Sequence, residues 1–477
     1  MVAHPRQLQK RPADQPRVLS FASESLWYLE RLTPNSPVYN VPFLCRLRGR
    51  LDLEAFRKAL NALVDRQAVL RTVFLTSKGS PVPYVVKKRP VELKNVELRH
   101  LPDCEREAEA RRLARQEAAR PFNLSRDPMF RPFLFRLGDE EYMFLFVTHH
   151  IAFELGSLAV LYRDIDCLYN AFVAGRTPHP PEMAFDESDF ALWQRQTLVG
   201  ERLEALSKYW RERLQGAPLL ELPLDFPRPR VHSHRGVRRF FTFAPELASS
   251  STALFLKLGS TPYRGLLAAF NVLLYCYSGL TDICVGSPFA SRCAGIEHTI
   301  GFFANTLVLR TDLSGDPTFR ELVKRVDRIV LRAIANADLG FEKIVEAVQP
   351  PRDPSRTPLV QVSFRGRMQP YASLQLDDLE CSIPEFIDNG TAKFDLALEL
   401  EASTGQACFF EYSSDLFREE TIVQMEQDFH TILRGLVADP DRQLSQIAAV
   451  EEVRQRIERR AERELASRPL SGSAVSV

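Results

Sequence analysis

The stretch MFRPFLFRLGDEEYMFLFVTHHIAFELGS at residues 129–157 decides the fold class. Two strongly apolar runs flank the Gly-Asp pair at residue 138, a pair typical of a β-hairpin turn. His149 and His150 directly follow the second run, and Ser157 precedes a stretch with apolar residues at helical spacing. A hairpin that continues through a polar turn into a helix indicates a fold that combines strands and helices. It places both histidines at the end of a buried strand.

The same mixture extends to both sides of this stretch. Residues 53–70 keep helical spacing behind Asp52, a candidate N-cap. Residues 394–401 alternate apolar and polar side chains, as a half-buried strand does, and ACFFEYSS follows the Thr-Gly turn at 404 as its hairpin partner. The predicted fold class is therefore α/β (α+β) in two lobes. The expected divisions are a flexible N-terminal arm at 1–16, an N-terminal lobe at 17–180, a C-terminal lobe at 181–458 and a flexible tail at 459–477.

Composition narrows the function classes. Lys+Arg (62) and Asp+Glu (61) nearly cancel, which argues against nucleic-acid binding because that needs a clustered basic excess. No apolar run approaches the roughly 20 residues of a membrane span, and the first residues contain no apolar leader core. The eight cysteines are scattered without metal-site or disulfide spacing. We therefore expect a cytoplasmic protein without membrane, nucleic acid or metal.

The adjacent histidines are the strongest chemical signal. In an extended segment His149 and His150 point to opposite faces, so one can line a cavity while the other packs inward. An imidazole of near-neutral pKa can position or deprotonate an attacking amine or hydroxyl, and Glu154 could orient it. Two other interpretations stand beside this one. The pair can sit in a loop without any task, or it can bind a metal with Glu154, although adjacent histidines aim poorly at one ion.

At these residues the sequence resembles the condensation domains of non-ribosomal peptide synthetases, in the chloramphenicol-acetyltransferase-like superfamily. Their signature is H-H-x-x-x-D-G, and THHIAFELGS lies in its place. The resemblance runs from about Val18 to about Ala449. Further segments similar to family motifs follow in the family's order: LSFASESLWYLERLTPNSPVYNVP (19–42), DRQAVLRTVF (65–74), VGSPFASR (285–292), IGFFANTLVLRTDLSGDPTFRELVKRV (300–326) and FEYSSDLF (410–417).

The resemblance implies two chloramphenicol-acetyltransferase-like lobes in a V-shaped pseudo-dimer around a central tunnel. His150 would be the catalytic group facing the reaction centre, and His149 would support it. Glu154 would pair with Arg292 of the other lobe, and Ser157 would cap the following helix. The implied partners are acyl or peptidyl carrier proteins that present substrates on a phosphopantetheine arm, with no bound cofactor. We expect a monomer that works as a free-standing protein.

The signature departs from the family at its last two positions. Glu154 replaces Asp and adds a methylene, and Leu155 replaces Gly. If that Gly has a positive φ, the Leu costs about 1–2 kcal/mol unless Gly156 lets the loop relax. We expect Leu155 and Gly156 to shape the tunnel. Two hypotheses remain: an acyltransferase that joins a carrier-bound acyl thioester to an amine or hydroxyl in non-ribosomal peptide or hybrid polyketide biosynthesis, and a catalytically silent condensation-like module that binds carrier or partner proteins.

Overall fold

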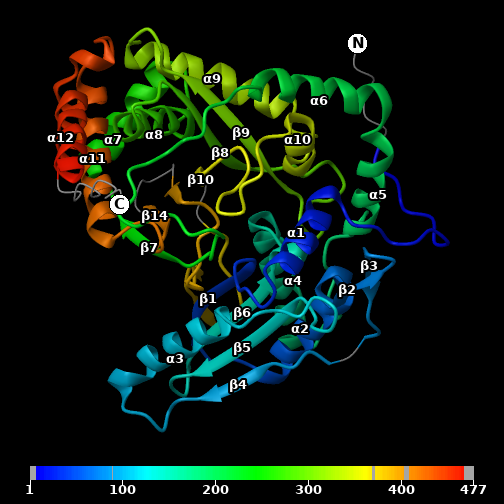
Figure 1. Ribbon diagram of the computed structural model, residues 1–477. Helices are drawn as coiled ribbons and strands as arrows, with labels where there is room; N and C mark the ends of the chain where they lie inside the picture. Colours follow the sequence, from blue (N-terminus) through cyan, green and yellow to red (C-terminus); the bar gives the residue numbers. More distant parts are fainter. Residues whose placement is uncertain (1–6, 89, 368–370, 402–407, 467–477) are drawn as a thin grey trace, which may run out of the picture.

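Two lobes form the structure, and each is built on a six-stranded sheet that carries helices (Figure 1). It is a computed structural model that describes residues 7–88, 90–367, 371–401 and 408–466. Each lobe has its own large hydrophobic core. The predicted mixed fold in two lobes is confirmed.

The first lobe grows around the Phe-rich hairpin. Strands β5 and β6 pair antiparallel, and the Gly138 N–H donates to the Glu141 carbonyl (3.0 Å) in the predicted turn. The sheet order is β11-β1-β6-β5-β4, with β12 also on β1. The side chain of Asp52 caps α2 as predicted, and α2 packs against α4. The elements are α1 (Phe21–Leu32), β1 (Asn40–Gly49), α2 (Leu53–Arg66), β2 (Thr72–Ser77), β3 (Ser80–Val85), β4 (Lys94–Glu97), α3 (Asp103–Ala118), β5 (Phe130–Arg136), β6 (Glu141–His149) and α4 (Leu155–Val173).

The second lobe buries one face of a mixed sheet under helices, in the order β7-β14-β13-β10-β8-β9. Leu396, Leu398 and Leu400 of β13 enter its core, as the alternation predicts, and β13 pairs antiparallel with β14. The strand is not half-buried as predicted, because Ala397 on its other face is buried as well. The predicted turn at 404 lies outside the described residues. The elements are α5 (Glu187–Thr197), α6 (Gly200–Leu214), β7 (Gly236–Phe241), α7 (Pro245–Lys257), α8 (Pro262–Ser278), β8 (Asp282–Ala290), β9 (Ala304–Asp312), α9 (Phe319–Ala335), α10 (Phe341–Val348), β10 (Val362–Arg367), β13 (Leu396–Glu401), β14 (Cys408–Ser413), α11 (Glu419–Ala438) and α12 (Ala448–Ala466).

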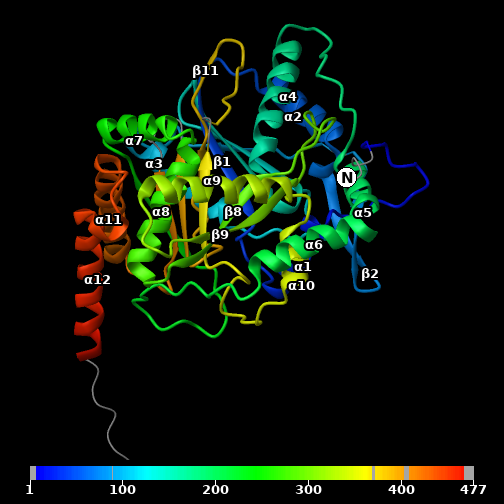
Figure 2. The ribbon, with the colours of Figure 1, turned by 90° about the horizontal axis from the view of Figure 1, so that it is seen from above.

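One segment of the second half crosses into the first lobe. Strands β11 (Leu379–Cys381) and β12 (Glu385–Phe386) both pair with β1, and Leu374 and Leu376 lie in the first core. Figure 2 shows β11 on the side of the molecule where α4 lies. The division of the lobes at residue 180 stays a prediction along the chain. In space, however, the first lobe also holds residues 374–387.

Secondary structure and contacts extend into both ends that were predicted to be flexible. Helix α12 continues to Ala466, so residues 459–466 of the predicted tail are helical. Figure 2 shows α12 at the edge of the second lobe remote from α5. In the N-terminal arm, Leu8 packs with the small cluster around Phe190, and the Arg11 N–H donates to Asp189 (2.7 Å). Leu8 and Arg11 of the predicted arm therefore contact the second lobe, the flexibility of both ends stays a prediction, and residues 1–6 and 467–477 lie outside the described residues.

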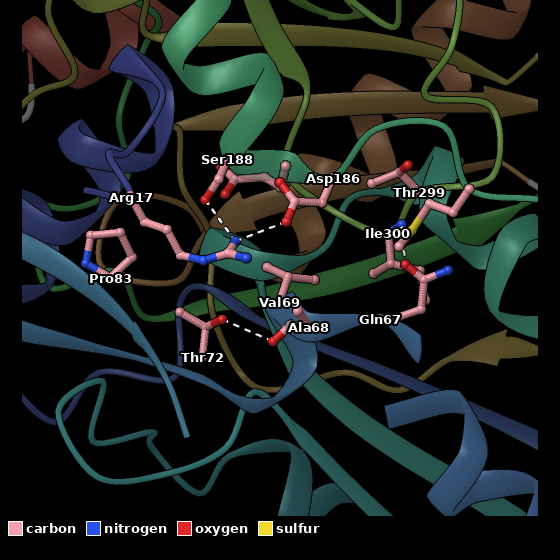
Figure 3. A pocket seen from close by; sticks show the side chains of 12 residues that line it. Arg17, Gln67, Ala68, Val69, Thr72, Pro83, Asp186, Ser188, Thr299 and Ile300 are labelled. Carbon is pink, nitrogen blue, oxygen red and sulfur yellow. Dashed lines mark hydrogen bonds and ion pairs between the residues drawn. The ribbon is translucent and has the colours of Figure 1, made fainter. Parts of the chain in front are cut away.

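The lobes are joined by hydrogen bonds beside a small pocket shown in Figure 3. Arg17 donates to Asp186 and to Ser188, both at 2.9 Å. The amide group of Gln67 donates to the carbonyl of His298 (3.0 Å) and accepts from the N–H of Ile300 (3.0 Å). A glutamine at position 67 therefore ties the first lobe to the second. No helix in the described part of the chain is long and apolar enough to cross a membrane.

Candidate active site at the lobe interface

Both histidines lie where strand β6 ends. A single 3-10 turn (His150–Ala152) then reverses the chain into α4. The N–H of His150 donates to the carbonyl of Tyr39 (2.8 Å), which fixes the backbone of the turn against the start of β1. The two side chains point to different surroundings, as the extended geometry of the strand predicts.

His149 is a packing residue. It is 1% exposed, and its ring makes edge contacts with Tyr39 and Phe122. Its Nδ1 accepts from the N–H of Ile151 (3.1 Å), so the hydrogen of the neutral ring is on Nε2, 3.7 Å from Glu30 Oε2. Burial lowers the pKa of His149, and Glu30 offsets this only in part. This side chain therefore supports the site from within the lobe.

His150 is held in the form that a base requires. Its Nδ1 lies 2.9 Å from the carbonyl oxygen of Phe153, which can only accept, so Nδ1 carries the hydrogen and Nε2 keeps its lone pair. The ring of Phe302, from the second lobe, meets the imidazole edge-on at 5.4 Å between centroids. Burial, reinforced by the charge of Lys393, lowers the pKa of His150 well below its usual value. His150 thus lies at the lobe interface as a neutral imidazole.

The predicted contact between Glu154 and Arg292 is present. Arg292 Nε donates to Glu154 Oε1 at 2.7 Å, and only 4% of the Glu154 side chain is exposed. The guanidinium also donates to Ser157 Oγ (2.9 Å) and to the carbonyls of Ile296 and Thr299 (3.0 Å each). Burial raises the pKa of Glu154, although Arg292 acts in the opposite direction. Arg292 therefore links α4 to the loop after β8.

Ser157 does not cap α4, which corrects our prediction. The helix begins at Leu155 after Glu154, so Ser157 already lies inside the first turn. Its hydroxyl instead donates to the Gly301 carbonyl (2.9 Å) and accepts from the Gly301 N–H (3.1 Å) and from Arg292. Ser157 is thus part of the contact between the lobes.

The backbone at Leu155 is not strained. Leu155 and Gly156 have no positive φ, because both belong to the first turn of α4. The expected cost of 1–2 kcal/mol therefore does not arise, and the side chain of Leu155 is 46% exposed. Gly156 is needed for a different reason: a Cβ there would lie 2.8 Å from Arg292 Nε and 3.1 Å from Glu154 Oε1. The tunnel-shaping role of both residues stays a prediction.

A cavity of about 210 Å³ reaches Arg292 and Phe302, which contact Glu154 and His150 respectively from the second lobe. It lies between α1, α5 and the ends of β8 and β9. Its lining includes Ala22, Trp193, Phe289, Asn305 and Ala337. Among the described residues, no group of three His, Cys, Asp or Glu is arranged to hold a metal ion.

A charged face of the second sheet was not predicted. Glu411 of β14 lies 2.8 Å from Arg238 and 3.0 Å from Arg365, and Arg365 also lies 3.8 Å from Glu399. Burial alone would raise the pKa of Glu411, but Arg365 and Arg238 outweigh it and lower the pKa to about 2. The alternation in β13 suggests that Glu399 faces solvent, yet this face lies against the first lobe. The sequence signal that could have revealed this charged face is the presence of opposite charges on strands that pair with each other.

Comparison with known proteins decides the family. Residues 15–457 match the family described as "Condensation domain". The chain belongs to the condensation-domain family. A linear gramicidin synthase protein of Brevibacillus parabrevis is 42% identical over 437 residues, which cover 90% of this chain and 8% of that protein. This chain therefore spans less than a tenth of that relative's length.

Solved structures agree with this assignment. The X-domain from teicoplanin biosynthesis has a TM-score of 0.84 and 27% identity, over 93% of this chain and 99% of that one. The complex of the X-domain and OxyB from the same biosynthesis matches with a TM-score of 0.82 and 27% identity, over 94% and 98%. The family has the chloramphenicol-acetyltransferase-like two-lobe fold that the sequence predicted.

Proposed function

We propose that the protein is an acyltransferase that joins a carrier-bound acyl thioester to an amine or hydroxyl. The observation that carries this proposal is the neutral imidazole of His150 at the lobe interface, whose Nδ1 carries the hydrogen so that Nε2 keeps its lone pair. The acceptor attacks the thioester carbonyl, the new C–N or C–O bond forms and the C–S bond breaks. His150 orients the acceptor and takes its proton, which then passes to the departing thiolate sulfur.

The proposed partners are acyl or peptidyl carrier proteins, whose phosphopantetheine arms enter a channel between the lobes. The cavity beside Arg292 and Phe302 supports such an approach, because the ring of Phe302, which lines it, also contacts the imidazole of His150. We further propose a monomer in the cytoplasm. The eight cysteines, scattered through the sequence without disulfide spacing, suit that reducing compartment.

The test is transfer of an acyl group between defined partners. Carrier proteins loaded with aminoacyl, peptidyl or fatty acyl groups are mixed with amine and hydroxyl acceptors, and the loss of acyl mass from the carrier is followed by intact-mass spectrometry. We expect at least one pair to react faster with the protein than without it. Amine and hydroxyl acceptors separate amide from ester products within the same panel.

The second candidate is a silent module that binds carrier or partner proteins. Two observations favour it: the departure of Glu154 and Leu155 from the family signature, and the similarity to an X-domain seen in complex with OxyB. Carrier binding without transfer from any donor, both in the wild type and in a variant with Glu154→Asp and Leu155→Gly, would establish this function and contradict the first.

A further inference from the structure

Lys393 lies in a loop that is fastened to both lobes. The loop runs from β12 in the first sheet to β13 in the second. The amide of Asn389 donates to the carbonyls of Pro37 (2.9 Å) and Asn40 (3.3 Å) in the first lobe. On the other side, Thr357 Oγ1 donates to the carbonyl of Lys393 (3.2 Å). The position of Lys393 relative to the first lobe is therefore fixed.

Tyr39 connects Lys393 to both histidines. The ammonium nitrogen of Lys393 lies 5.2 Å from the centre of the Tyr39 ring, in a cation–π contact. The same ring meets His149 edge-on at 6.1 Å, and the Tyr39 carbonyl accepts the N–H of His150 (2.8 Å). Tyr39 thus contacts both the ammonium group of Lys393 and the backbone of His150, the proposed base, at the lobe interface.

We propose that Lys393 is a positioning residue for the acyl transfer: its ammonium charge adds to the effect of burial in keeping the imidazole of His150 unprotonated, so that Nε2 stays available to the acceptor. The role that we assign to Lys393 rests on the proposed acyl transfer. The test does not, because it measures only the protonation of His150. The same positive field disfavours the ammonium form of an incoming amine, which must lose its proton before it can attack.

The charges around the two groups determine the order of protonation. Burial, aided by Arg365 and opposed by Glu411, lowers the pKa of Lys393 to about 7. The pKa of His150 lies well below its usual value. As the pH falls, Lys393 is therefore protonated first, and its charge opposes a second proton on His150. The charged groups that act on Lys393, Tyr39 and the two histidines include Glu30, Arg131, Arg238, Glu342, Arg365 and Glu411. Glu399 lies next to Arg365.

The test is an NMR titration of His150 in the full chain. Histidine is labelled with ¹³C, and the His150 signal is identified by its loss in His150→Gln. Lys393→Met should raise the titration midpoint of His150 by on the order of one pH unit, the effect of one nearby charge. Lys393→Arg should restore the wild-type behaviour. Lys393→Gln is measured beside Lys393→Met so that the result does not depend on one variant folding.

The matched control is Lys58→Met, because Lys58 is an exposed lysine paired with Glu54 within α2. An unchanged His150 titration in both Lys393→Met and Lys393→Gln would overturn the inference, as would a Lys393→Arg variant that titrates like Lys393→Met. No turnover is needed for this measurement. Failure of the inference is therefore distinguishable from failure of the proposed function. If transfer is detected, the acid limb of kcat/KM should move to higher pH in Lys393→Met by the same amount.

Discussion

Replacing Arg292 with alanine should destabilise the protein by about 3–5 kcal/mol, because it strands a buried carboxylate. The carboxylate of Glu154 accepts from Arg292 Nε at 2.7 Å, and only 4% of its side chain is exposed. The same substitution removes the donor to Ser157, Ile296 and Thr299. Most of the loss should nevertheless come from Glu154, since a buried charge without a partner costs more than a buried neutral carbonyl or hydroxyl without one.

Urea unfolding of a double-mutant cycle measures this loss. Glu154→Gln combined with Arg292→Ala should be more stable than Arg292→Ala alone, because no buried charge remains. The control is Arg320→Ala, which breaks a more exposed pair with Asp441 and should change stability by about 0–1 kcal/mol. A free energy of unfolding for Arg292→Ala equal to that of Arg320→Ala, or no recovery in the double variant, would refute the reasoning.

The loss of stability in Arg292→Ala should also depend on pH in a defined direction. Burial already raises the pKa of Glu154 in the folded protein, and without Arg292 it should rise further. A folded-state pKa above the unfolded value favours folding below the unfolded pKa, and this contribution is lost as the pH rises. The gap in stability between wild type and Arg292→Ala should therefore shrink as the pH is lowered towards 4.5, the ordinary value for this carboxyl.

Three further substitutions separate packing from chemistry. His149→Ala should lower the free energy of unfolding by about 2–4 kcal/mol, because it empties a buried site, while turnover per folded molecule persists. Leu155→Gly should change stability by at most about 1 kcal/mol and should let bulkier acyl groups react, if the Leu shapes the tunnel; unchanged substrate selectivity would count against that role. Gly156→Ala should lower the melting temperature, because its Cβ would press on Arg292; wild-type melting would show that the ion pair moves freely.

Local patterns predicted the features that depend on neighbours in sequence. The hairpin at Gly138, the cap at Asp52 and the alternation in β13 all follow from turn chemistry and periodicity, and all are present. The contact of Glu154 with Arg292 joins residues 138 positions apart. This contact was predicted from the resemblance to the family, because the periodicity of the sequence carries no information about it.

The missed features depend on the packing of one lobe on the other. Ser157 resembles a helix cap in sequence, but Gly301 of the second lobe offers its hydroxyl both a donor and an acceptor inside the first turn. Lys393 precedes a strand and looks like a surface residue. It is half-buried, because its loop joins the two sheets and its ammonium group lies over the ring of Tyr39 in the first lobe.

The most direct test of the central claim is single-turnover acyl transfer by His150→Ala, with a loaded carrier and an acceptor that the wild type accepts. The control is His179→Ala, which changes an exposed histidine elsewhere in the chain. We predict that His150→Ala melts close to the wild type and transfers about 10²–10⁴-fold more slowly, while His179→Ala transfers at the wild-type rate. A folded His150→Ala variant that transfers as fast as His179→Ala would show that His150 is not the catalytic group.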